Sequence, residues 1–152
     1  MHIAAKFGFE SLVEFFINKD ANFDARDKLL KTPLHYACEF GCTKIVNMLL
    51  KVGASTLDQD NCGRTAMHYA VYSGRSEILA LLTAGDTALV HISDHAKRTP
   101  LHHAVFMETN QKLIVQKLLN YGADVNCLDA DKRTPLHHAA EANIVWAVDI
   151  LV

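Results

Sequence analysis

The chain has 152 residues, half of them hydrophobic and 21% charged, and a formal net charge of −2 with its nine histidines neutral. This length suits one domain with a sizeable core, and the nearly balanced charge argues against a nucleic-acid partner. Four cysteines are too few for a disulfide scaffold and no secretory signal is recognisable, so we expect reduced thiols in the cytoplasm or nucleus. The longest nearly apolar run, 144–152, falls short of the roughly 20 residues that span a bilayer, so no direct membrane insertion is expected.

One six-residue phrase recurs along the chain. It reads Thr-Pro-Leu-His-Tyr-Ala at 32–37, Thr-Ala-Met-His-Tyr-Ala at 65–70, and Thr-Pro-Leu-His-His-Ala at both 99–104 and 134–139. A clipped copy begins the chain at 1–5. The threonines that open the four full copies are 33, 34 and 35 residues apart: Thr32, Thr65, Thr99 and Thr134. Such a period indicates a solenoid of stacked repeats.

Each phrase predicts the start of a short first helix, because Thr is a good N-cap and Pro suits the next position. The first helices should end at Gly8, Gly41 and Gly74. A second helix follows, with apolar pairs such as Ile45-Val46 and Leu49-Leu50 on one stripe. Glycines in the left-handed conformation are expected to end the second helices, at Gly53, Gly85 and Gly122.

This phrase, at this period, resembles the ankyrin repeat family over the whole chain. The resemblance implies an all-α repeat fold, a solenoid of stacked helix-turn-helix pairs with short β-hairpin fingers. We expect a single domain at 1–152, with repeats at approximately 1–26, 27–59, 60–93, 94–128 and 129–152. An aspartate opens each finger at the family's position, at Asp27, Asp60, Asp94 and Asp129.

Several positions depart from the family pattern. The finger glycine is present only at Gly63. Leu30, Lys97 and Lys132 stand at the equivalent positions of the other fingers, and we expect those finger tips to be tighter or rearranged. The third repeat has one extra residue between Leu82 and Asp94, and the fourth has two extra residues around 108–111. Insertions of this kind are expected in loops.

The resemblance also explains most of the histidines. In the family, the motif histidine bonds the helix-starting threonine and the backbone of a neighbouring repeat, which makes it a structural clip. That role falls here on His35, His68, His102 and His137, and on His2 in the clipped copy. The doublets His102-His103 and His137-His138 leave a zinc site as a minor alternative, but adjacent helix residues point about 100° apart and do not converge on one ion.

The remaining candidate chemistry is sparse. Cys38 and Cys42 lie four residues apart, but a closed zinc site needs four ligands, so we expect Cys38 in the core. Cys62 lies near a finger tip and is expected to be the exposed, reactive cysteine. Phosphate-loop, nucleophile-elbow, zinc-helix and dinucleotide signatures are absent, so we expect no enzyme activity, no metal and no cofactor.

Partners of ankyrin stacks usually lie against the concave face, which the fingers and first helices form. The first helices of repeats one to four each present an aromatic residue there, and a basic residue precedes each motif threonine. Aromatic residues and Met are enriched at binding hot spots, while charges speed encounter. The alternative is that some of these aromatics pack against the fingers. We expect the partner to be another protein with an acidic or apolar segment, bound across repeats two to four by Phe40, Tyr72, Phe106, Met107, Arg64 and Arg98.

Three function classes remain open at this point. The first is a non-catalytic protein–protein interaction module, and the second is a regulatory or substrate-recruiting arm of a larger enzyme, phosphatase regulator or membrane channel. The third is a spacer without a partner, against which the aromatic column argues. Because the chain begins inside a helix and ends in a strongly apolar one, we expect it to be part of a longer chain.

Overall fold

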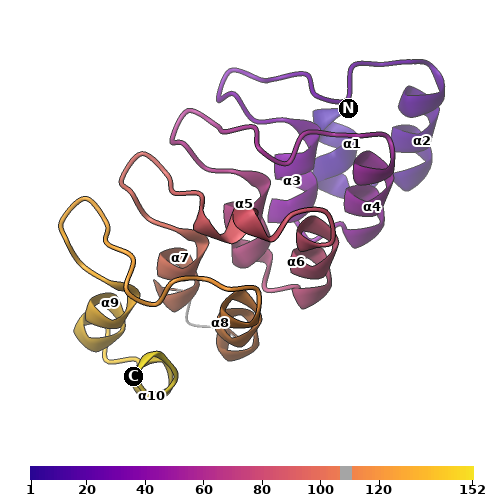
Figure 1. The fold of residues 1–152 in the computed structure, drawn as a ribbon. Coiled ribbons are helices and arrows are strands. Elements are labelled where there is room, and N and C mark those ends of the chain that lie inside the picture. The colour runs from indigo at the N-terminus through magenta and orange to yellow at the C-terminus, as the bar shows by residue number, and fades with distance from the viewer. Residues whose placement is uncertain (107–110) are drawn as a thin grey trace.

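The computed structural model describes residues 1–106 and 111–152, which form five helix pairs stacked in chain order (Figure 1). The first helices of the pairs are α1 (His2–Phe7), α3 (Pro33–Glu39), α5 (Ala66–Ser73), α7 (Pro100–Phe106) and α9 (Pro135–Glu141). The second helices are α2 (Glu10–Asn18), α4 (Thr43–Lys51), α6 (Ser76–Thr83), α8 (Gln111–Asn120) and α10 (Val145–Leu151). The two termini lie at opposite ends of the stack, and long loops, the fingers, project from one side.

The first helices start as the repeated phrase predicts. Thr32 has extended backbone angles (φ −93°, ψ 167°), and its side chain and backbone N–H both contact the Nδ1 of His35, at 2.9 and 3.0 Å. Thr65 and His68 repeat the arrangement at 3.0 and 3.1 Å. A histidine here takes the place that Glu or Gln fills in the usual capping box. Each helix therefore begins with two of its orphan groups satisfied by a pair of residues three positions apart.

The same histidines also join neighbouring repeats. Because Nδ1 accepts the threonine N–H, the proton lies on Nε2, which donates to a backbone carbonyl of the next repeat. The pairs are His35 with Arg64 at 3.1 Å, His68 with Arg98 at 3.2 Å, and His102 with Arg133 at 3.2 Å. Burial lowers the pKa of His68 to about 4, which keeps this ring neutral at physiological pH.

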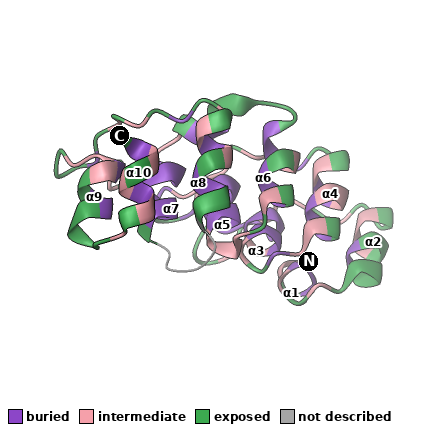
Figure 2. Cartoon of the chain, turned by 90° about the horizontal axis from the view of Figure 1, so that it is seen from below, coloured by how far each residue is buried: buried purple, intermediate pink, exposed green. Residues whose placement is uncertain are grey.

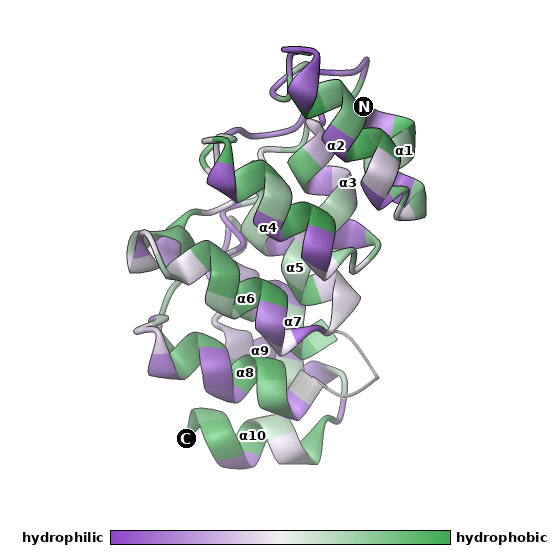
Figure 3. Ribbon diagram, turned by 90° about the vertical axis from the view of Figure 1, so that its right-hand side faces the viewer, coloured by the Kyte–Doolittle hydropathy of each residue, from purple (hydrophilic) through white to green (hydrophobic). Residues whose placement is uncertain are grey.

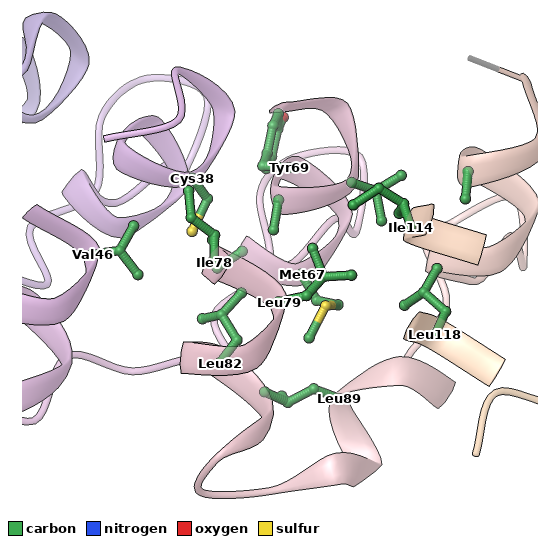
Figure 4. Close-up of a cluster of buried hydrophobic side chains, with 14 of the residues drawn as sticks. Cys38, Val46, Met67, Tyr69, Ile78, Leu79, Leu82, Leu89, Ile114 and Leu118 are labelled. Atoms are coloured by element: carbon green, nitrogen blue, oxygen red, sulfur yellow. The ribbon is translucent and has the colours of Figure 1, made fainter. Parts of the chain in front are cut away.

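A continuous apolar core runs between the first and second helices, where buried residues gather in the interior of the stack (Figure 2). The second helices α2, α4, α6, α8 and α10 lie side by side down the stack in Figure 3, and residues of each contribute to the buried core. Figure 4 shows Leu79 of α6 beside Met67 of α5, and Ile78 of α6 beside Cys38 of α3. Each fully buried side chain of this size contributes about 1.5–3 kcal/mol relative to exposure, so neighbouring repeats stabilise one another.

The fingers are tight turns, and the β-hairpins expected from the family resemblance are not confirmed. Within a finger, the Asp27 N–H donates to Lys31 O at 3.0 Å. A backbone hydrogen bond of 2.9 Å joins each pair of adjacent fingers: Asn61 N–H to Leu29 O, His95 N–H to Cys62 O, and Ala130 N–H to Ala96 O. A single hydrogen bond between neighbouring fingers does not make the repeated pairing of a β-sheet, and residues 1–106 and 111–152 contain no β-strand.

The fingers without glycine keep the conformation of the one that has it. Gly63 has φ +79°, and Leu30, Lys97 and Lys132 have φ +59°, +57° and +60°. The expectation that these tips are rearranged is therefore wrong. The left-handed region costs a residue with a Cβ about 1–2 kcal/mol, a cost that the same turn accepts in three of the four fingers.

The end of the third repeat differs from the sequence-based prediction. Gly53 and Gly122 have positive φ as expected, but Gly85 does not, and α6 closes on Ala84 in the right-handed region. The chain then forms a 3₁₀ helix, η1 (Thr87–His91), which Asp86 caps by accepting from the Ala88 N–H at 2.8 Å. The extra residue of this repeat lies in that segment, whereas the turn predicted to hold the fourth repeat's insertion lies largely outside the described residues.

Candidate functional site

The candidate binding surface is the side of the stack that carries the fingers. We call it the finger face and define it by two columns of side chains. One column stands at the base of the fingers, Lys31, Arg64, Arg98 and Arg133, and the other stands eight residues later at the ends of the first helices, Glu39, Tyr72, Phe106 and Glu141. Phe40 lies next to this second column, at the end of α3.

Two of the predicted aromatic anchors are exposed on this face. The exposed fraction is 47% for Phe40 and 45% for Phe106. The ammonium of Lys6 lies 5.1 Å from the ring centroid of Phe40, within the range of a cation–π contact. Met107, the third apolar anchor beside Phe106, lies outside the described residues.

Tyr72 is held more firmly than the sequence suggests. Its hydroxyl lies 2.8 Å from the Nδ1 of His103, and its ring meets those of His103 and Tyr69 edge-on, with centroids 5.5 and 5.8 Å away. The residue is half-buried, and burial raises the pKa of its hydroxyl. Tyr72 therefore packs within the face while leaving part of its surface open.

The finger aspartates tie each finger to its first helix. Each Oδ1 accepts backbone N–H groups two and four residues later, and each Oδ2 accepts from a side chain nine residues later. That donor is a tyrosine hydroxyl in two repeats and a histidine Nε2 in the next two. The pairs are Asp27–Tyr36 at 2.7 Å, Asp60–Tyr69 at 2.6 Å, Asp94–His103 at 2.9 Å and Asp129–His138 at 2.7 Å. The sequence reading missed this pairing, although the nine-residue spacing is present in all four copies.

These contacts shift the acidity of both partners. Burial alone would raise the pKa of Asp60, but hydrogen bonds from Tyr69 and from the backbone of Arg64 and Cys62 outweigh it and lower the pKa. The bond to Asp27, with burial, raises the pKa of Tyr36 to about 12. Burial lowers the pKa of His103 to about 4 despite the opposing carboxylate of Asp94. The contacts thus keep the carboxylates ionised and the histidine neutral near pH 7.

The cations at the finger bases are neutralised to different degrees. The outer two meet a glutamate eight residues later, Lys31–Glu39 at 2.8 Å and Arg133–Glu141 at 3.1 Å. Among the described residues, the carboxylate within 4.0 Å of Arg98 is that of its own finger aspartate, Asp94, 3.6 Å from Nε. Within the described part of the chain, Arg64 has no carboxylate within 4.0 Å, and its guanidinium carbon lies 5.8 Å from the Tyr72 ring centroid.

A pocket of about 320 Å³ opens on the finger face between the fourth and fifth repeats. Phe106 and His138 form part of its wall, with ring centroids 4.7 Å apart, and Arg98 lies on the same side. Asp131 and Glu141 supply its acidic rim. The predicted residues Phe106 and Arg98 therefore meet in one cavity, whereas Phe40 belongs to a different part of the stack.

No group of three or more potential metal ligands is positioned to hold an ion within residues 1–106 and 111–152. Cys38 is buried, and burial raises the pKa of its thiol, while Cys62 is exposed. Among the described helices, none has the length and apolar character needed to cross a bilayer.

Comparison with known families agrees with the repeat pattern. The model that describes ankyrin repeats in three copies matches residues 1–88 and again 87–152, so the two matches together cover the chain. A search of the curated proteins gives no match. Ankyrin repeats are generally protein–protein interaction modules and are typically non-catalytic. With the phrase at its 33-residue period, the stacked helix pairs and the matched residues in agreement, the chain belongs to the ankyrin repeat family.

Proposed function

We propose that the chain is a non-catalytic interaction module that binds another protein on its finger face, across repeats two to four. The observation that carries this proposal is the exposure of Phe40 and Phe106 on the first helices. Neither ring is needed to fill the core, since the buried cluster is built from other residues. Large exposed rings at the centre of a surface are typical of residues that dominate binding energy.

The surroundings of these rings support the same function. Arg64 stands at the finger base of the third repeat and Arg98 at that of the fourth, in the same repeat as Phe106, and charges near the apolar anchors speed the encounter with a partner. Tyr72 lies in the third repeat, with its hydroxyl fixed by His103, so it offers a preoriented ring edge. A preoriented side chain loses less conformational freedom on binding. We include Met107 in the proposed apolar patch because it follows Phe106 in the sequence.

A display selection tests this function. Fragments of natural proteins would be displayed and selected on the intact chain, and the affinities of the retained fragments would be compared for Phe40→Ala and Phe106→Ala. Leu113→Ala is the matched control, because Leu113 is a 50% exposed apolar residue on α8, a second helix. We expect each phenylalanine variant to weaken binding at least about tenfold, since central aromatic truncations commonly cost 2 kcal/mol or more, while the control binds normally.

Thermal unfolding of all three variants separates binding from stability. The phenylalanine variants should unfold close to the parent, because both rings are exposed. Equal affinity of the parent and both phenylalanine variants for every retained fragment would contradict the proposal, and so would a loss confined to Leu113→Ala.

A further inference from the structure

We infer that the segment bound on the finger face carries an acidic and an apolar side chain, each at its own place along the stack. It presents a carboxylate to Arg64 and Arg98, over repeats three and four, and an apolar side chain to the pocket beside Phe106, over repeats four and five. The occupant is therefore an extended segment of another protein in which an aspartate or glutamate lies close to a leucine-like or aromatic residue. This inference rests on the proposed function and specifies the partner's chemistry.

The outer cations of the column, Lys31 and Arg133, already form ion pairs with carboxylates. Lys31 is 2.8 Å from Glu39, and its ammonium also lies 4.1 Å from the Tyr69 ring centroid, with a side chain only 11% exposed. Arg133 is bound by Asp131 at 2.9 Å and by Glu141 at 3.1 Å. A partner carboxylate at either place would have to displace an existing one, so the ends of the cation column offer little attraction.

Within residues 1–106 and 111–152, the central cations Arg64 and Arg98 have no glutamate partner of this kind. The position eight residues after the finger cation is glutamate in repeats two and five, but it is Tyr72 after Arg64 and Phe106 after Arg98. A partner carboxylate can therefore approach these two guanidinium groups without displacing a glutamate. The charge-assisted hydrogen bond that a guanidinium donates to a carboxylate is among the strong ones.

Aromatic rings next to these guanidinium groups strengthen the assignment. Arg64 lies over Tyr72, and Arg98 shares the pocket with Phe106. The Tyr72 ring shields one side of the Arg64 guanidinium from water, and a lower local dielectric increases its attraction for an anion. The plane of a guanidinium also matches the two oxygens of a carboxylate.

The apolar side chain fits the pocket of about 320 Å³ beside Phe106. The rings of Phe106 and His138 and the side chains of Ala96 and Ala130 supply its apolar lining, and its charged lining residues are Arg98, Asp129, Asp131, Arg133 and Glu141. In the fifth repeat, a partner carboxylate would meet the acidic side chains that already neutralise Arg133, and these would repel it. The acidic residue of the partner therefore lies over Arg64 and Arg98 and its apolar residue in the pocket, which fixes the place of each along the stack.

Selection from a phage-displayed library of random twelve-residue peptides tests the inference. Enriched peptides should carry Asp or Glu near an apolar residue, and synthetic copies should bind the intact chain. Arg64→Gln and Arg98→Gln should each raise the Kd at least about tenfold, as the loss of a hydrogen-bonded charge pair commonly does. Lys44→Gln is the control of equal charge change, because the Lys44 side chain is 78% exposed on α4, a second helix, where it pairs with Glu10.

The arginine variants keep the repeat clips, because His35 and His68 bind the backbone carbonyls of Arg64 and Arg98, not their side chains. Unfolding midpoints close to the parent are therefore expected, and peptides with the acidic residue replaced by Gln or by phosphoserine complete the test. Binding that survives the Gln replacement, tighter binding of the phosphoserine form, or unchanged affinity in both arginine variants would overturn the inference.

These failures differ from failure of the proposed function. Peptides that lack acidic residues but still lose affinity with Phe40→Ala and Phe106→Ala would overturn the inference and leave the finger face as the binding surface. A library that yields no enriched sequence also overturns the inference, and the longer natural fragments then decide the proposed function alone.

Discussion

His103 Nε2 lies 2.9 Å from Oδ2 of Asp94, in the place where earlier repeats put a tyrosine hydroxyl. The other ring nitrogen, Nδ1, faces the hydroxyl of Tyr72 at 2.8 Å. With both nitrogens engaged, a neutral ring that donates from Nε2 and accepts at Nδ1 satisfies every group. Protonation would remove the acceptor at Nδ1 and place a charge in a buried site.

The free energy of unfolding should therefore fall in mild acid. Burial lowers the pKa of both His103 and His68 to about 4, below the ordinary value of 6.5. The unfolded chain then binds protons first, so stability is complete above about pH 6.5, falls between pH 6.5 and 4, and changes no further from these groups below pH 4. The slope is of the order of 1 kcal/mol per pH unit for each histidine. Urea unfolding at pH 7.5 and pH 5 measures it.

His103→Tyr isolates one of the two contributions, since tyrosine occupies the equivalent position at Tyr36 and Tyr69. Groups that face His103 remain in the variant: Asp94, Arg98, Arg64, Tyr72 and His68. We expect a shallower loss of stability between pH 7.5 and pH 5 than in the parent. An identical pH dependence in parent and variant would show that His103 does not contribute.

The hydrogen bond between the capping threonine and the motif histidine should contribute more to the free energy of unfolding than an ordinary hydrogen bond on the surface. Thr65 is fully buried and its hydroxyl lies 3.0 Å from His68 Nδ1, so Thr65→Ala should lower the free energy of unfolding by about 1–2 kcal/mol, as N-cap removal does. Thr65→Ser keeps the hydroxyl and should lose clearly less. Guanidinium unfolding of both variants checks this, and equal losses would assign the effect to the lost methyl group.

Gly63 is required for a reason that the other finger tips do not share. A Cβ there would lie 2.7 Å from the His95 backbone nitrogen, and the residue has φ +79°. Gly63→Ala should therefore destabilise the chain by more than about 1 kcal/mol. Lys97→Gly is the reciprocal change, at φ +57°, and should be neutral or stabilising. Thermal unfolding compares them, and an alanine variant as stable as the parent would refute the close approach.

The cysteines should separate by reaction rate with a thiol reagent in the folded state. Cys62 is exposed, whereas Cys38 is fully buried and has a raised pKa, which disfavours the reactive thiolate. We expect rapid modification of Cys62, and modification of Cys38 only after unfolding. Mass spectrometry of peptides from the labelled protein measures both rates. Fast labelling of Cys38 at neutral pH without denaturant would indicate local opening of α3.

Much of the architecture follows from local pattern. The repeated phrase located the helix starts at Thr32, Thr65 and Thr134, because capping depends on residues only three positions apart. Gly85 was misjudged because the turn after α6 is decided by Asp86 and the 3₁₀ segment that follows. The tips at Leu30 and Lys97 were misjudged because the surrounding turn, more than the residue, imposes the left-handed conformation.

The repeat period and the helix pairs can be predicted from the sequence alone, since each depends on spacing within one repeat. Only the tertiary structure decided which residues of the finger face are available. Lys31 and Arg64 occupy equivalent positions, yet one is neutralised by Glu39 and the other faces Tyr72. Likewise, Tyr72 is held by His103 of the next repeat, whereas Phe106 is left exposed beside a pocket. Exposure and pairing arise from contacts across repeats and between finger and helix, which are set by the stacking geometry and not by the period alone.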